Sequence, residues 1–475
     1  MAQQLYFSRD SQMFLEIGRS DGSTSVWKIP VLEGFSFSQA TNTSEITLAE
    51  MEAGDGTSRR GRRAFNDSLA PVDFSFSTYI RPFTAAVGTA AGTADSAAKV
   101  HAVEEALWAL FSGPAAYTGY AFTDQVTPGS DVSNLAFDQS NVATLGPDAG
   151  ANLYFELGDA NKLCYKLSKI AISEASIDFD IDGVAQINWT GFADTLEDVS
   201  LPVTIVGAIA DDGLDVTGTP FNTDSPSTDL NRRIHGKDPA PATGVTTADA
   251  YLKTITDSST AEFNVNQVLA TGTVLTLLGP RATIDEGLGQ TNNFIRNRLT
   301  KCIVITNTDP AIALEDGYTL TLTGGNITLT NNITYLTPEE LGIVNIPIGH
   351  VTGARAFGGT MTCYLSDETG NVNASKDFFL DLASSDQRNE VTNDFSLEFL
   401  IGGGTVTNPG AANATCTDAN LEDVALAVKF PHCHVSIPTH GIEDIITLET
   451  TFMALPSTIE LADEVSMRYK GLADV

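Results

Sequence analysis

Residues 176–193 read SIDFDIDGVAQINWTGFA, and this stretch decides the fold because its apolar and polar residues alternate. Side chains two residues apart lie on the same face of a β-strand, so Ile177, Phe179 and Ile181 are predicted to face a core. Asp178, Asp180 and Asp182 are then predicted to form an acidic stripe on the opposite face of the strand. Like charges at this spacing repel one another, so the stripe is expected to serve something other than stability.

The same alternation recurs along the chain, which is therefore predicted to be mainly β. It occurs in LEGFSFSQ (32–39), VDFSFSTYI (72–80), TLTLTGGNITLT (319–330) and DIITLETTFMA (444–454). Apolar residues at helical spacing predict a helix at 97–111, and a second, shorter helix is predicted at 375–385 with Ser375 as its N-cap.

These elements occur twice in the same order, which predicts a duplicated domain. STYI (77–80) matches TCYL (362–365), and LSKIAISE (167–174) matches PHCHVSIP (431–438). Each copy is predicted to be a β-sandwich with one packed helix. The predicted division is a first domain at 1–197 with a loop-rich insertion near 113–150, a linker with a small surface insertion at 198–293, and a second domain at 294–475. The repeat itself is predicted to cover residues 20–195 and 295–460. The first and second predicted domains, with the strands that adjoin them, are called the first copy and the second copy below, and residues 198–293 are called the central segment.

The composition is strongly acidic. The chain has 475 residues, and 26 Lys and Arg against 60 Asp and Glu give a formal net charge of -34. A protein that grips nucleic acid sets cations against phosphate, so this chain is predicted to repel DNA on average. No apolar run is long enough to predict a membrane span, and the N-terminal residues do not have the pattern of a signal peptide.

No residue cluster has the spacing of a catalytic or metal site. DFDIDG (178–183) matches the start of a calcium loop, but Trp189 occupies the twelfth position, where the loop needs an acid. His432 and His434 flank Cys433 in a strand-like run, so the thiol is predicted to point away from both imidazoles. We therefore predict no catalytic residue, no metal and no cofactor.

Two stretches of the first copy, RRAFNDSLAPVDFSFSTYIRPF (62–83) and ASIDFDIDGVAQINWTGF (175–192), resemble the major tail tube proteins of long-tailed bacteriophages. ITLTNNITYLTPEELGIVNIPIGHVTGA (327–354) and HVSIPTHGIEDI (434–445) resemble the duplicated type of this family, in which one polypeptide carries two tube domains. The resemblance implies two tandem tail-tube β-sandwich domains, trimeric pseudo-hexameric rings, and a β-barrel tube that forms on oligomerisation. It also implies a structural subunit of the virion, not an enzyme, which is assembled in the cytoplasm of the bacterial host and stacks into a conduit for genome ejection.

The resemblance places the hairpin at 176–193 in the inner sheet of that tube. Asp178, Asp180 and Asp182 are therefore predicted to face the lumen, joined by Asp73 and Glu449. Viral DNA would then pass without specific binding, because a negative wall weakens contact with phosphate. The alternative is that these acids face solvent outside the tube. The predicted partners are other copies of the chain and other tail proteins at the tube ends, with no membrane involved.

The densest basic cluster is SRRGRR (58–63). Because the chain is otherwise acidic and self-associating, Arg59, Arg60, Arg62 and Arg63 are predicted to lie on an arm at 51–63 that contacts the next ring. A solvated loop and a nucleic-acid patch remain as alternatives for this cluster. For the whole chain, the competing hypotheses are a β-sandwich surface-layer or adhesin-like binding protein and a carbohydrate-active enzyme on a sandwich scaffold.

Overall fold

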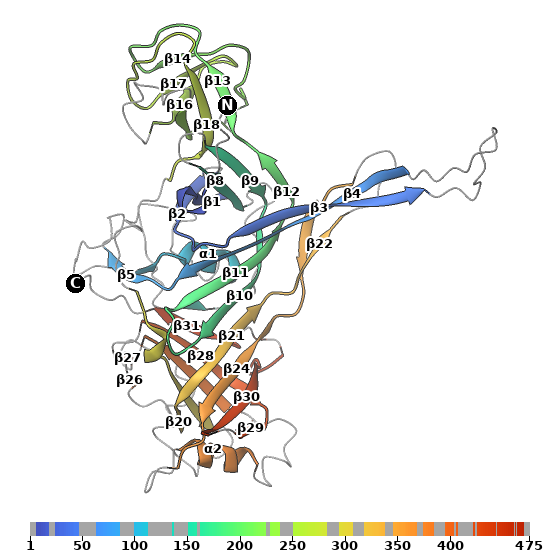
Figure 1. The fold of residues 1–475 in the computed structure, drawn as a ribbon, viewed down its shortest axis with the longest axis vertical. Helices are drawn as coiled ribbons and strands as arrows, with labels where there is room; N and C mark the ends of the chain where they lie inside the picture. The colour runs from blue at the N-terminus through green and yellow to red at the C-terminus, as the bar shows by residue number, and fades with distance from the viewer. Residues whose placement is uncertain are drawn as a thin grey trace, which may run out of the picture.

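The computed structural model describes residues 6–18, 24–46, 63–85, 99–112, 135–136, 151–158, 162–224, 229–237, 250–282, 294–306, 318–337, 345–367, 374–383, 395–402, 405–406, 421–422, 425–442, 444–459, 461 and 463–469. Within them the chain is mainly β, as predicted, and the strands form several antiparallel sheets without a closed barrel (Figure 1). Among these residues, no helix is long and apolar enough to cross a membrane.

The first copy is built from two layers of strands. Its outer sheet has the order β12-β9-β8-β1-β2, and its inner strands have the order β10-β11-β4-β3. Aromatic rings join the layers: Phe37 of β3 stacks on Phe155 of β8 with ring centroids 4.9 Å apart. The strands are β1 Gln12–Gly18, β2 Thr24–Ile29, β3 Ser36–Ile46, β4 Arg63–Tyr79, β8 Ala151–Leu157, β9 Leu163–Ser168, β10 Ala171–Phe179, β11 Gln186–Ala193 and β12 Thr195–Asp198.

The second copy repeats this arrangement. Its outer strands have the order β20-β19-β25-β28 with β31 on β28, and its inner strands have the order β21-β24-β30 with β29 on β30. Phe452 of β30 packs on Phe399 of β25, with ring centroids 5.5 Å apart. The strands are β19 Lys301–Thr306, β20 Tyr318–Leu320, β21 Leu322–Thr330, β24 Ala356–Tyr364, β25 Phe395–Ile401, β28 Leu426–Val435, β29 Thr439–Ile442, β30 Ile446–Ala454 and β31 Ser466–Tyr469.

The strand pairings correspond between the copies. The inner pairs β3–β4, β4–β11 and β10–β11 correspond to β21–β24, β24–β30 and β29–β30. The outer pairs β1–β2, β1–β8 and β8–β9 correspond to β19–β20, β19–β25 and β25–β28. A duplicated sandwich requires this correspondence, while the predicted domain limits at 197 and 294 stay a prediction.

One strand pair joins the inner sheets of the two copies. β10 runs antiparallel to β21, with Ser176 opposite Thr328 and Ile177 opposite Ile327 (Figure 1). Phe179, at the end of β10, stacks on Phe399 of the second copy with ring centroids 5.7 Å apart. The inner sheet therefore passes without interruption from β3 in the first copy to β30 in the second.

Both predicted helices are present, but the first begins later than predicted and Ser375 is not the N-cap of the second. α1 spans Glu105–Ser112, because the preceding β6 (Lys99–Ala102) pairs with β5 (Pro82–Ala85) instead of continuing the helix. α2 spans Ser375–Leu382, so Ser375 is its first residue and not its N-cap. The hydroxyl of Ser375 donates to the carbonyl of Tyr364 at 2.7 Å, which ties the helix to the end of β24.

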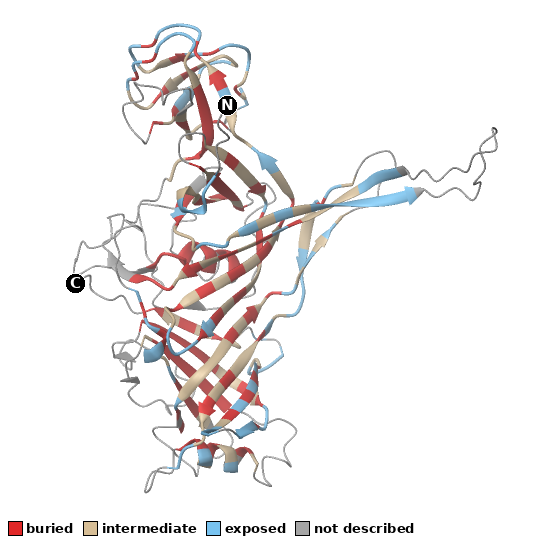
Figure 2. Cartoon of the chain, viewed as in Figure 1, coloured by how far each residue is buried: buried red, intermediate tan, exposed pale blue. Residues whose placement is uncertain are grey.

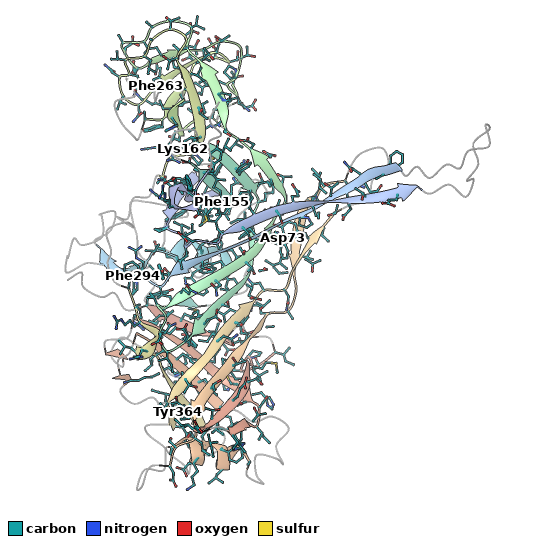
Figure 3. All side chains as sticks on the ribbon, in the orientation of Figure 1. Asp73, Phe155, Lys162, Phe263, Phe294 and Tyr364 are labelled. Carbon is teal, nitrogen blue, oxygen red and sulfur yellow. The ribbon has the colours of Figure 1, made fainter. Side chains whose placement is uncertain are left out.

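The central segment folds into two three-stranded sheets around a core of its own, which includes Leu214, Phe263 and Leu275 (Figures 1 and 3). The sequence predicted here a linker with a small surface insertion. The guanidinium of Arg233 forms an ion pair with the buried Glu156 of β8 and lies 4.0 Å from the ring of Phe14, so this body is docked on the first copy. Its strands are β13 Leu201–Thr204, β14 Gly213–Asp215, β15 Arg232–Lys237, β16 Leu252–Ile255, β17 Thr260–Phe263 and β18 Val274–Pro280.

Two hairpins extend from the inner sheet. β3 and β4 continue beyond the sheet as an exposed ribbon, here called the first arm (residues 41–46 and 63–69) (Figure 2). β22 (Ile333–Leu336) and β23 (Gly349–Thr352) form the second arm, defined as residues 333–336 and 345–352. The arms touch where the amide of Leu69 donates to the carbonyl of Asn345 at 2.8 Å. The remaining elements are β7 Leu135–Ala136, β26 Thr405–Val406, β27 Leu421–Glu422 and the 3-10 turns η1 Ser8–Asp10 and η4 Asn297–Leu299.

Candidate assembly surface

One face of the inner sheet is mainly polar across both copies, although the apolar side chains of Phe192 and Met453 also lie on it. The strand registers align Ser77 with Asn188, Asn188 with Ser176, and Ser176 with Thr328, so this row crosses from the first copy to the second. We call this surface the polar face and define it by Ser36, Ser38, Asp73, Ser75, Ser77, Glu174, Ser176, Asp178, Asn188, Thr190, Asn326, Thr328, Thr330, Thr360, Thr362, Glu449 and Thr451. Hydroxyl, amide and carboxylate groups make up this set, and it contains no Lys or Arg.

The opposite face of the same strands is apolar and buried. Phe74, Trp189 and Ile177 lie on it in the first copy, and Ile327 and Phe452 lie on it in the second. A strand that buries one face must expose the other, so the core fixes which side chains make the polar face. Two-residue alternation in the sequence therefore predicts this surface correctly wherever the strand is regular.

Side-chain hydrogen bonds run between neighbouring strands on the polar face. Ser77 Oγ donates to Asn188 Oδ1 at 2.7 Å, and Asn188 Nδ2 donates to Asp178 Oδ2 at 2.8 Å. In the second copy Thr360 Oγ1 donates to Asn326 Oδ1 at 2.9 Å. Groups that are paired within the surface have less need of an external hydrogen-bond partner.

Three of the predicted acids, Asp73, Asp178 and Glu449, are exposed on the polar face. Figure 3 shows Asp73 at the root of the first arm and Tyr364 at the other end of the sheet, near α2. The acids are therefore spread along and across the sheet, in both copies.

The predicted acidic stripe ends earlier than expected. β10 stops at Phe179, and Ile181, which was predicted to face the core, is 43% exposed. Asp180 accepts a hydrogen bond from the amide of Gly183 at 2.5 Å, which closes a turn in place of the strand. Asp182 forms an exposed ion pair of 3.0 Å with Arg298, of the kind that contributes little to stability. Asp180 and Asp182 therefore lie in the turn between β10 and β11.

The predicted arginine loop falls mostly outside the described residues. Arg59, Arg60 and Arg62 lie beyond them, and Arg63 is the first residue of β4, paired with Ile46 of the first arm. The contact that the loop was predicted to make stays a prediction.

Two strand edges of the inner sheet are open, and sequence reasoning missed both. In the described part of the chain, β3 pairs on one side with β4, and β29 pairs on one side with β30. Residues 439–442 of β29 are all exposed, with Ile442 at 80%. An unpaired edge presents amide and carbonyl groups to another strand, so these are the natural sites for sheet extension.

The two copies are also tied together in the core. Trp108 Nε1 of α1 donates to the hydroxyl of Tyr469 in β31 at 2.8 Å, and that hydroxyl donates to Glu104 Oε1 at 2.5 Å. Burial raises the pKa of Glu104 to about 7, although the hydrogen bond from Tyr469 opposes the shift. Because this carboxyl group has a pKa near 7, the stability of the contact between the two copies is expected to depend on pH.

The geometry offers no evident metal site. Among the described residues, no group of three or more His, Cys, Asp and Glu side chains is arranged to hold a metal ion. Cys433 is buried while His432 and His434 are half-buried, so the predicted alternation in this run is correct.

A comparison with known proteins gives a similarity that spans the chain. No protein-family model matches. The chain is 24% identical over 468 residues to the tail tube protein pb6 of Escherichia phage T5, a match that covers 97% of this chain and 75% of the relative. The similarity includes both copies, confirms the predicted resemblance to a major tail tube protein of the duplicated type, and supports a structural role in a phage tail.

Proposed function

We propose that this chain, a tail tube protein of the duplicated type, closes in threes into rings that stack into a hollow conduit for viral DNA. The observation that carries the proposal is the β10–β21 pair, which joins two tube domains edge to edge inside one chain. The corresponding edges at the two ends of the inner sheet are open. Repetition of the same joint between chains extends the sheet, and closure of the sheet removes its exposed edges.

The internal joint supplies the register of the joint between subunits. β29 corresponds to β10 and β3 corresponds to β21, because each holds the same place in its inner sheet. At the internal joint Ser176 pairs with Thr328, and Ile177 pairs with Ile327. The same register between subunits places Thr439 opposite Ser38 of the next subunit, and His440 opposite its Phe37. Ile442 then takes the place of Phe179, which is 7% exposed at the internal joint. The exposed side chain of Ile442 is thus covered when the ring closes.

The polar face is proposed as the wall of the conduit. It carries Asp73, Asp178 and Glu449 but no Lys or Arg, so it offers phosphate no cation to bind. Several of its hydroxyl and amide groups are engaged within the face, as in the row from Ser77 to Asp178. Each ring repeats these acids, and their field extends over about 8 Å at physiological salt. DNA would therefore slide along the wall without specific binding.

The remaining contacts of the tube are proposed from the sequence. The segment at 51–63, with Arg59, Arg60, Arg62 and Arg63, is proposed to contact the acidic surface of an adjacent ring. Other tail proteins would bind at the two ends of the tube, where stacking stops. The role is structural, as the name of the relative indicates for that protein.

Electron microscopy of the purified protein tests the proposal directly. We expect rings and hollow rods of constant diameter, with three chains in each ring by mass measurement of the smallest assembly. A monodisperse monomer at high concentration, or filaments without a lumen, would contradict the proposed function. A surface-layer protein would instead give two-dimensional sheets, and an adhesin-like module would stay monomeric.

A further inference from the structure

The second arm packs against β11 of the first copy, and this contact surface is called its seat. The hydroxyl of Tyr335 donates to the carbonyls of Lys169 and Phe192 at 2.9 and 3.2 Å. The ring of Tyr335 lies 6.0 Å from the ring of Phe192 and 5.4 Å from His350 across the arm. The arm of the second copy is thus held on β11 of the first copy by an aromatic contact beside the β10–β21 joint.

The strand registers identify the equivalent residues at the other end of the chain. Phe192 lies opposite Asp73, and Met453 lies opposite Gly358. Asp73 precedes the matched STYI motif by the same four residues by which Gly358 precedes TCYL, so Met453 is the counterpart of Phe192.

The same count along the other arm identifies a second equivalence. His350 precedes Thr362 by the same twelve residues by which Phe65 precedes Ser77, so Phe65 is the counterpart of His350. Phe65 lies on the first arm and pairs with Ser44 across it. Ser44 therefore takes the place of Tyr335, and the aromatic ring on the first arm is supplied by Phe65 from the neighbouring strand.

Both counterparts are uncovered in the single chain. Phe65 is 49% exposed, and Met453 is 54% exposed. Phe192, in contrast, is half-buried beneath Tyr335. A methionine sulfur and an aromatic ring make a favourable contact, so the two exposed residues are chemically matched as well as equivalent in position.

We infer that the first arm of one subunit seats on β30 of its neighbour in the same ring, with Phe65 against Met453. The inference rests on the proposed function, because it places this seat beside the β29–β3 joint of a closed ring. The occupant is a second copy of this chain, since the first arm and β30 hold the same places in their sheets as the second arm and β11, which lie against each other within one chain. The root of the first arm therefore acts within a ring, whatever the loop beyond it contacts.

Cysteine cross-linking tests the seat. The variant Phe65→Cys with Met453→Cys is assembled under reducing conditions and then oxidised, and its products are separated without reductant. The described native cysteines, Cys164, Cys302, Cys363 and Cys433, are all buried, and the unmodified protein serves as the background control. We expect covalent dimers and trimers, and no larger product, because a ring of three chains closes on itself.

The matched control is Phe65→Cys with Val268→Cys, since Val268 is 63% exposed but lies in the central segment. We expect no covalent oligomer from the control pair. A ladder that continues beyond three chains would mean that the arm reaches another ring, and tubes that form without any cross-link would mean that the seat does not exist. Either result overturns the inference while leaving the tube intact.

A second variant keeps the test independent of cysteine geometry. Phe65→Asp removes an exposed side chain, so the subunit is expected to fold, with an unchanged circular dichroism spectrum. Its critical concentration for assembly should rise about tenfold or more, since burial of an apolar side chain is worth more than the roughly 1.4 kcal/mol of a tenfold change. Val268→Asp should leave that concentration unchanged. An unchanged value for Phe65→Asp contradicts the seat, whereas absence of rings from the unmodified protein contradicts the proposed function itself.

Discussion

The indole nitrogen of Trp108 donates a hydrogen bond of 2.8 Å to the hydroxyl of Tyr469, a residue 361 positions further along the chain. Both side chains are fully buried, and the indole of Trp108 also packs edge-on against Trp189 at 4.7 Å between ring centroids. The helix of the first copy is thereby fixed to the last strand of the second. The two copies therefore share a core as well as a sheet.

Replacement of Tyr469 by Phe is expected to weaken this shared core. The change deletes one hydroxyl, which links Trp108 to Glu104, from a site that excludes water. Loss of a buried hydrogen bond of this kind costs about 1–3 kcal/mol, to be measured by urea unfolding of the unassembled subunit. The control is Tyr251→Phe, because within the described residues the hydroxyl of Tyr251 makes no hydrogen bond. Equal stabilities of the two variants would contradict the expectation.

The raised pKa of Glu104 predicts a dependence of stability on pH. Its pKa of about 7 in the folded chain lies above the value of about 4.3 expected when the chain is unfolded, because burial disfavours the carboxylate. Its contribution to stability is complete below the unfolded pKa and is lost as the pH rises through the folded pKa. In Glu104→Gln this loss is absent, so the variant should gain stability relative to the unmodified protein between pH 5 and pH 8. Urea unfolding across that pH range measures this gain, with Glu197→Gln as an exposed control. If the difference in unfolding free energy between Glu104→Gln and the unmodified protein does not vary with pH, the expectation is contradicted.

The open edge at β29 predicts a variant that folds but does not close a ring. Ile442→Lys puts a charge on a side chain that is 80% exposed in the single chain and buried at the proposed joint. The monomer should keep its unfolding midpoint, and the yield of rings in electron micrographs should fall at least about tenfold, because an unpaired charge would be desolvated at the joint. Ile459→Lys is the matched control, since Ile459 is 99% exposed and lies outside the inner sheet. Normal ring yield from Ile442→Lys would exclude this edge from the joint.

The polar face predicts an effect of charge on DNA passage. Asp73→Lys with Asp178→Lys should still allow tubes to form, because both carboxylates are exposed and lie outside the core. Phages that carry this variant are expected to eject DNA more slowly at low salt, with the defect fading as salt rises, since added cations contact phosphate. Asp198→Lys with Asp257→Lys carries the same charge change at exposed sites away from the polar face and should eject normally. Equal ejection rates for the two variants would place the polar face outside the lumen.

Local alternation in the sequence predicts the core well where strands are regular. Ile177 and Phe179 are buried as predicted, because a strand that buries one face fixes which of its side chains enter the core. The same reasoning was wrong for Ile181, where the Asp180 carboxylate closes a turn with Gly183 and ends the strand. Periodicity alone contains no information about this competing hydrogen bond.

Features that depend on distant partners were not predictable in this way. Phe263 and Leu275 lie in a segment rich in Thr, Asp and Gly, and their shared core becomes evident when two sheets are brought together. Likewise, THGI at 439–442 has no apolar alternation, and its importance follows from its position at the edge of the inner sheet. Of the candidate site, the sequence therefore predicted Asp73, Asp178 and Glu449 on one face and an arm at 51–63, but not the open edges or the second arm.

The β10–β21 pair also changes how assembly depends on protein concentration. In a ring of three such chains, every second joint has already formed when the chain folds, and its partners never had to meet by diffusion. Formation of the ring then depends on the cube of the subunit concentration, whereas six separate domains would require the sixth power and a correspondingly larger loss of translational freedom. In the proposed ring, a covalent link between two domains would thus let assembly begin at a lower subunit concentration than six separate domains would need.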